Sequence, residues 1–231
     1  MTATEQVKKT PMKNFTLLLL SLALLTGCHH RLHDEVRGSG NIQRETRAVN
    51  AFTSISTEGA FEIEVVCQKP QSVEVQGDDN ILSLISTEVT NNILHIKSLR
   101  SYSVSEPVVL KIAVPDLVGI SASGAGSFVV NGVNNDKFDI DANGAPSIRI
   151  SGETKALTID ASGAGKIDTH KLRAPRVEVD AKGVAKVEVY ASEQLDVTVS
   201  GPSHVVYQGD PVVRQTIHGP GSVEKKVTEA S

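Results

Sequence analysis

The sequence predicts an all-β protein that forms a parallel β-helix-like solenoid of about 19-residue repeats, with two strands per repeat. Three observations lead to this prediction. Glycine recurs at a nearly constant interval in the second half of the chain, and apolar and polar residues alternate on both sides of each glycine. The core must also be filled by Val, Ile, Leu and Ala, because aromatic residues make up only 3% of the chain and Trp is absent. The β-branched residues among these favour strands.

The repeat is visible in sequence segments such as ISASGAGSFVV, IDASGAGKIDT and VDAKGVAKVEV. An earlier copy, ISTEGAFEIEV, surrounds Gly59. The glycines of the later copies are Gly124, Gly144, Gly163, Gly183, Gly201 and Gly219. Self-similarity at a fixed interval of about 20 residues indicates a fold built by stacking one small unit.

Within each copy the apolar residues stand at even offsets from the glycine. The position four before it reads Ile120, Ile140, Ile159, Val179, Val197 and, in the last copy, Gln215. The position three before it is polar, and in three copies it is an aspartate: Asp141, Asp160 and Asp180. Alternation with period two on both sides of a glycine turn predicts two half-buried strands in each repeat.

Such a unit cannot bury its apolar face alone, so successive copies are expected to stack on one another. A parallel β-helix is the simplest arrangement, with equivalent strands about 4.8 Å apart and columns of Ile, Val and Ala inside. The alternative is an antiparallel sandwich with a hairpin every 8 to 12 residues or so.

Residues 41–117 are less regular. Strand-like runs are expected at Phe61–Val66, Ser72–Val75, Ile93–Ile96 and Val108–Val114. Asp78 and Asp79 are expected to cap a short helical turn at 81–85. We expect this half to start the solenoid and to shield its first open edge.

The N-terminus is predicted to be an export signal. The apolar run from Phe15 to Leu25 is too short to cross a bilayer as a helix, and it follows the basic residue Lys13. The next residues, Leu25-Thr26-Gly27-Cys28, resemble the lipobox of bacterial lipoproteins, in which the cysteine is acylated before cleavage. An ordinary cleaved signal with an incidental cysteine is the alternative. Translation could start at Met1 or at Met12.

We therefore expect residues 1–27 to be a lipoprotein signal peptide, 28–40 a tether, 41–227 the repeat domain and 228–231 a polar tail. Lipidated Cys28 would anchor the protein in the outer membrane, because His29 stands where an Asp would favour inner-membrane retention in enterobacterial lipoproteins. His29, His30 and His33 fit a solvated spacer better than a metal site, because a flexible tether offers no supporting shell. No metal site and no cofactor are predicted.

The residues resemble a known family in three successive blocks: FEIEVVCQKPQSVEVQGDDNILSLISTEVTNNILHIKS, VVLKIAVPDLVGISASGAGS, and the glycine-centred repeats. The resemblance is to the putative auto-transporter adhesin, head GIN domain family, over roughly 52–227. It implies a β-helix-like all-β repeat in a Gram-negative envelope lipoprotein. The family's name suggests adhesion, but it provides no functional residues to carry over.

Composition excludes several classes of function. The net charge is -4, and removal of Lys8, Lys9, Lys13 and Glu5 with the signal peptide (+2) leaves -6, so no basic footprint for nucleic acid is present. Cys28 and Cys67 are the only cysteines, so an acylated Cys28 leaves Cys67 without an intrachain partner. No nucleophile-elbow pattern accompanies the many serines. The glycine-rich turns lack the Lys and the helix of a phosphate loop.

The aspartates Asp141, Asp160 and Asp180 are the one candidate ladder for a cation or ligand. Stacked in register, they would repel one another or attract a cation such as Ca²⁺. Nearby lysines, Lys166, Lys182 and Lys186, favour a solvated face with cross-strand pairs instead.

The sequence thus predicts a lipid-anchored envelope protein without enzymatic activity. It would be a binding, adhesion or scaffolding module for a glycan, an envelope polymer or a protein. A polysaccharide lyase or hydrolase built on a β-helix is one alternative, and a purely structural envelope component is another.

Overall fold

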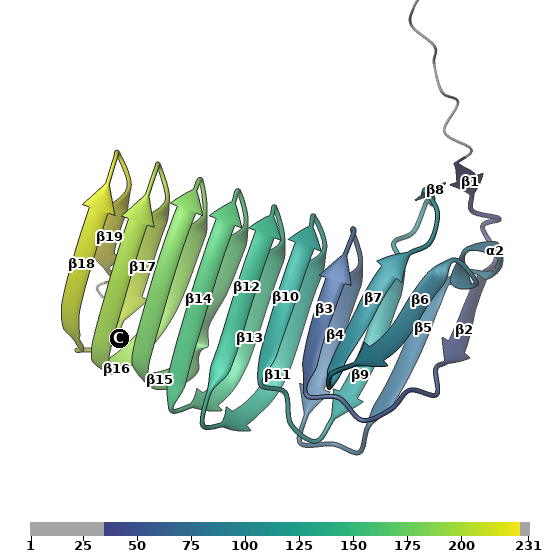
Figure 1. Cartoon of the computed structure of the whole chain (residues 1–231), viewed down its shortest axis with the longest axis horizontal. Coiled ribbons are helices and arrows are strands. Elements are labelled where there is room, and N and C mark those ends of the chain that lie inside the picture. Colours follow the sequence, from purple (N-terminus) through teal and green to yellow (C-terminus); the bar gives the residue numbers. More distant parts are fainter. Residues whose placement is uncertain (1–34, 227–231) are drawn as a thin grey trace, which may run out of the picture. The chain divides into compact units, whose positions relative to one another are not determined.

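The computed structural model describes residues 35–226, and these form an all-β solenoid (Figure 1). The signal peptide and Cys28 lie outside the described residues. Each turn of the solenoid is one coil, which places one strand in each of two facing sheets. Consecutive coils from Gly119 onward pair through parallel strands, so the predicted parallel β-helix-like fold is confirmed and the antiparallel sandwich is wrong.

The first sheet contains, in spatial order, β6 (Ile85–Thr90), β7 (Ile93–Ser98), β3 (Ser54–Glu58), β10 (Gly119–Gly124), β12 (Phe138–Gly144), β14 (Ala156–Gly163), the later parts of β15 (Lys166–Gly183) and β16 (Lys186–Ser200), and β18 (Val212–His218). The second sheet contains β2 (Ile42–Thr46), β5 (Ser72–Asp78), β9 (Val109–Val114), β4 (Glu62–Cys67), β11 (Ser127–Asn135), β13 (Ser147–Thr154), the earlier parts of β15 and β16, β17 (His204–Gln208) and β19 (Ser222–Lys225). Separate from both, β1 (Val36–Arg37) pairs with β8 (Tyr102–Ser103).

The repeat columns stack in register. Ile140 lies beside Ile159, which lies beside Val179, and all three are at most 2% exposed. The alanine column follows the same register, with Ala142, Ala161 and Ala181 buried. Burial of these side chains between the sheets is the main stabilising contribution to each coil, because a single coil cannot shield its apolar side chains from water without its neighbours.

The first half of the chain departs from a simple succession of coils. The β3–β4 coil lies between the β7–β9 coil and the β10–β11 coil, although β7 and β9 follow it in sequence (Figure 1). Beyond β7 and β9, the antiparallel strands β6, β5 and β2 cover the open edges. These strands shield the first edge as expected, but the order of the coils was not predicted.

The short helix also differs from its prediction. The helix α2 (Asp79–Leu82) begins and ends before the expected turn at 81–85, and Asp78 makes no side-chain capping bond. Asp78 instead accepts a hydrogen bond from the backbone N–H of Gly40. The carboxylate therefore fixes the incoming chain rather than the helix. Within residues 35–226, no helix is long and apolar enough to span a membrane.

The last coil of the solenoid consists of β18 and β19, and no described strand pairs with the outer edge of β18. Val212 and Ile217 are exposed there, 67% and 38% respectively. Gln215 takes the inner position that isoleucine or valine holds in the earlier coils. A polar residue at an inner position of an edge strand disfavours the addition of further strands.

A bend in the second-sheet strands of the middle coils positions the candidate site. The register between β11 and β13 shifts between Val130 and Val133, and that between β13 and β15 shifts between Arg149 and Ser151. Past the shift, Val133 and Leu172 still point inward and are buried. The bend therefore leaves the core closed while it redirects the outer side chains beside it.

Candidate functional site

The predicted aspartate ladder exists as a ladder on the outer face of the first sheet. Asp141 is in register with Asp160, and Asp160 with Asp180. Lys182 lies between two of them, with its Nζ 2.7 Å from an Asp180 carboxylate oxygen and 3.5 Å from one of Asp160. The hydrogen bond to Asp180, aided by the charge of Asp160, raises the pKa of Lys182 above its ordinary value.

Asp141 has a different partner, because Asn143 Nδ2 donates a hydrogen bond of 2.7 Å to it. Each aspartate of the ladder thus has a polar partner from the protein. Asp141 and Asp160 also line a shallow groove of about 480 Å³ that reaches Ser56 and His95 on the neighbouring coils. The arrangement favours a solvated face, and the cation hypothesis is open to a direct test.

Replacement of Asp141, Asp160 and Asp180 together by Asn is expected to leave the melting temperature nearly unchanged, because exposed ion pairs contribute only about 0–1 kcal/mol each. Added Ca²⁺ should shift the melting temperature of neither protein. Thermal unfolding with and without Ca²⁺ checks this. A Ca²⁺-dependent rise in wild type that disappears in the triple variant would show instead that the ladder binds the ion.

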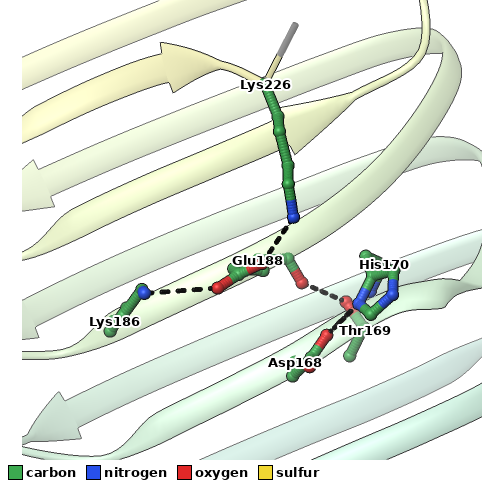
Figure 2. A network of polar contacts seen from close by, with 6 residues as sticks. All are labelled: Asp168, Thr169, His170, Lys186, Glu188 and Lys226. Atoms are coloured by element: carbon green, nitrogen blue, oxygen red, sulfur yellow. Dashed lines mark hydrogen bonds and ion pairs between the residues drawn. The ribbon is translucent and has the colours of Figure 1, made fainter. Parts of the chain in front are cut away.

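A second cluster of charged side chains lies on the outer face of the second sheet (Figure 2). Asp168 and His170 come from β15, two residues apart on the same side of the strand, and Glu188 lies beside Asp168 on β16. Asp168 pairs with Nδ1 of His170. Glu188 lies 3.3 Å from the Lys186 ammonium and 3.6 Å from that of Lys226.

Asp168, His170 and Glu188 each offer a potential metal-ligand atom, and these atoms lie within 4.8 Å of one another. The contacts shown in Figure 2 favour a balanced ion-pair network instead, because both carboxylates already have cationic or donor partners. The largest single effect on the pKa of Asp168 is desolvation, which raises it. The hydrogen bonds and the charge of His170 together outweigh desolvation, so the pKa of Asp168 is lowered. The carboxylate is therefore held in its charged form.

The bend pocket is a cavity of about 230 Å³ next to this cluster. Its polar lining comes from Asn131, Arg149, Ser151, Asp168, His170 and Lys171. Val129 adds a half-exposed apolar side chain to its lining, whereas the side chains of Val130 and Ile150 belong to the core and are at most 2% exposed. Polar groups from three neighbouring coils thus gather beside one half-exposed apolar side chain.

A second cavity, of about 500 Å³, lies on the other side of the bend. Asn134, Glu153 and Arg173, a few residues beyond those of the bend pocket on the same segments, line it. The Arg173 guanidinium carbon is 5.9 Å from the centre of the Tyr190 ring, which lines the same cavity. The two cavities therefore adjoin across the bend.

The bend pocket contains the residue types of a serine hydrolase, but not their hydrogen bonds. Asp168 orients His170, and Ser151 lines the same pocket. The Ser151 hydroxyl, however, donates to Asn131 Oδ1 at 3.0 Å. A serine nucleophile requires its hydroxyl on the histidine that takes its proton. This geometry does not supply an activated serine.

Cys67 is buried and has no disulfide partner among the described residues. Burial, with a further contribution from the charge of Asp116, raises the pKa of its thiol to about 11. The thiol is therefore neutral at physiological pH and unreactive. It acts as a small apolar residue in the inner column of β4.

The aspartate ladder could be predicted from the sequence because it follows the repeat. The bend pocket could not, since Asn131, Ser151 and Lys171 lie where the coils lose their common register. The available signal was local: Asp168 and His170 alternate around the buried Thr169, and Glu188 occupies the position of Asp168 in the next coil.

Comparisons with known proteins agree with this fold. The sequence model of the family described as "Putative auto-transporter adhesin, head GIN domain" matches residues 51–211. A putative adhesin from Bacteroides fragilis NCTC 9343 is structurally similar, with 23% identity and a TM-score of 0.66 over 83% of this chain and 100% of the other. A search of curated protein sequences found no match.

Two further solved structures are similar. A putative adhesin from Parabacteroides merdae ATCC 43184 has 18% identity and a TM-score of 0.54, over 84% of this chain and 100% of the other. A protein from Parabacteroides distasonis ATCC 8503, described as a putative lipid binding protein, has 20% identity and a TM-score of 0.51 over the same shares. At these identities the similarity establishes the fold.

Proposed function

The chain belongs to the family of putative auto-transporter adhesins with a head GIN domain, and from that premise we propose that it is a lipid-anchored binding module of the outer membrane. Its ligand would be a glycan, an envelope polymer or a protein. Cys28 would carry the lipid, and the solenoid of residues 35–226 would present the binding surface. The adhesin descriptions of the family and of similar structures support a place at the cell envelope.

One observation supports binding above all: the outer faces repeat the same polar positions on successive parallel strands. The ladder at Asp141, Asp160 and Asp180 is one such column, and the open groove beside it crosses several coils. Equivalent positions on neighbouring strands are about 4.8 Å apart. A surface of this kind suits an extended ligand that itself has a repeating structure.

A screen of the full-length protein in detergent against purified envelope polysaccharides and proteins tests this proposal. We expect at least one of them to be retained on the immobilised protein. Variants with charge-reversed outer columns, such as Asp160→Lys, would identify the face that is used. Failure of every glycan, polymer and protein to bind would contradict the proposal and favour a purely structural envelope component.

The second candidate is an enzyme that acts on polysaccharide. The oriented pair of Asp168 and His170 beside an open pocket is the observation that favours it. A histidine held by a carboxylate is a common general base. The engaged hydroxyl of Ser151 argues against nucleophilic catalysis there, so this candidate stands second.

The anchor has its own test, since the lipobox ends at Cys28. The Cys28→Ser variant is expected to leave the membrane fraction and to lose labelling by fatty acid, because acyl chains would hold the polar domain at the membrane. Fractionation and metabolic labelling of both proteins measure this. Cys67→Ser is the matched control and should stay with membranes. A Cys28→Ser protein that remains with membranes, beside an unlabelled wild type, would contradict the anchor.

A further inference from the structure

The bend pocket holds two cationic side chains without an ion pair in the part of the chain that the structure describes. Arg149 lies beside Asp168 in the strand register, yet the only ion pair of Asp168 within residues 35–226 is with His170. Lys171 has no carboxylate partner within the same residues. Both line the pocket. Their charges are therefore available to an anionic group that enters it.

A neutral donor accompanies the two cations. Asn131 accepts the Ser151 hydroxyl through Oδ1, so its amide is oriented, and its Nδ2 makes no hydrogen bond within residues 35–226. The guanidinium of Arg149 can bind a carboxylate with two parallel hydrogen bonds. Donors on Arg149, Lys171 and Asn131 thus surround one cavity in which the carboxylate, Asp168, already has His170 as its partner.

The other groups around the pocket restrict the classes of ligand that would fit it. Val129 supplies a half-exposed apolar surface beside these donors, which suits the C–H face of a sugar ring. The negative charge of Asp168 would repel a doubly charged phosphate more than a singly charged carboxylate. Because the whole chain has a net charge of -4, general attraction cannot hold a polyanion, and only a local cationic site can do so.

We propose that the bend pocket binds the carboxylate of a uronic acid unit, so that the ligand of this protein is an acidic polysaccharide. This inference rests on the proposed binding function and names the ligand class. Arg149 and Lys171 hold the carboxylate, Asn131 donates to it, and Val129 contacts the ring. The cavity with Arg173 and Tyr190 across the bend receives a neighbouring sugar unit.

Calorimetric titration of the full-length protein in detergent with an oligogalacturonate tests the proposal. Three further probes are the same oligomer with methyl-esterified carboxyls, a neutral glucan and a poly-aspartate peptide. The protein variants are Arg149→Gln with Lys171→Gln, and the charge-matched control Lys137→Gln with Arg214→Gln. The control residues are exposed and lie outside the bend pocket.

We expect wild type and control to bind the oligogalacturonate, and the bend-pocket variant to bind it about tenfold more weakly or worse, since charge-assisted hydrogen bonds are lost. Methyl esterification should weaken binding similarly. Added salt should weaken binding to wild type. Equal melting temperatures for the two double variants would show that folding is not the cause.

Other outcomes overturn the inference. Equal binding by wild type and the bend-pocket variant would place the ligand elsewhere and leave the general binding function intact. Binding of poly-aspartate without oligogalacturonate would assign the pocket to an acidic protein partner. If the protein does not bind oligogalacturonate but retains another polymer in the screen described above, the proposed ligand class is wrong and the proposed binding function still stands. If no probe or polymer binds, the proposed function fails as well.

Discussion

Ile159→Asp is expected to unfold the solenoid or to lower its free energy of unfolding by several kcal/mol. Ile159 is 1% exposed and lies between Ile140 and Val179 in an inner column. An aspartate there would either bury an unpaired charge or take up a proton, and both are costly in an apolar interior. Domains of this size are stable by only about 5–15 kcal/mol, so one such change removes a large part of the margin. Chemical denaturation followed by circular dichroism measures the loss.

The matched control is Thr158→Asp, which adds the same side chain one residue away on the outer face. Thr158 lies in register between Asp139 and Glu178, so a third carboxylate would add repulsion. Like charges directly opposite one another cost only about 0.2–1 kcal/mol. We therefore expect a small loss for Thr158→Asp. Similar losses for both variants would show that the assignment of inner and outer positions is wrong.

Gly163→Ala is expected to have the second large effect, on the order of 3 kcal/mol or more, because strain and steric overlap act together. The φ of Gly163 is +121°, a conformation that alanine rarely adopts. A Cβ atom there would lie 2.2 Å from the carbonyl oxygen of Gly144 in the preceding coil. Relief would require the two coils to separate, which weakens the parallel ladder on both sides of the turn.

A control separates strain from overlap. Gly40 also has a positive φ, +80°, but a Cβ built there meets nothing within 4 Å. Gly40→Ala should cost only the conformational strain, on the order of 1 kcal/mol. Urea denaturation of both variants compares the losses. If Gly163→Ala is no more destabilising than Gly40→Ala, close stacking of the coils is not the reason why the repeat requires glycine at this position.

The repeat columns could be predicted from the sequence because they depend on local alternation. Inner residues such as Ile159 and outer residues such as Asp160 differ by one position, and the register of parallel coils follows once the glycines are aligned. The position of the β3–β4 coil between later strands could not be predicted in this way. It depends on the antiparallel return of β5 and β6, and no local pattern specifies long-range pairing of that kind.

The candidate site was predictable only in part, for a related reason. The aspartate ladder follows the repeat, so its members could be aligned. The bend pocket combines Arg149, which follows the repeat, with Lys171, which lies beyond the register shift. A one-residue irregularity moves every following side chain to a new position, so the alignment no longer shows which residues meet.

The solenoid is proposed above all to bind a polymer of the envelope without cleaving it. The most direct test incubates the full-length protein in detergent with each polysaccharide that it retains, and then compares chain lengths by size-exclusion chromatography. We expect the polymer to be retained on the immobilised protein and to be recovered at its original length. A shortened polymer would contradict this expectation and favour the alternative of a polysaccharide-cleaving enzyme.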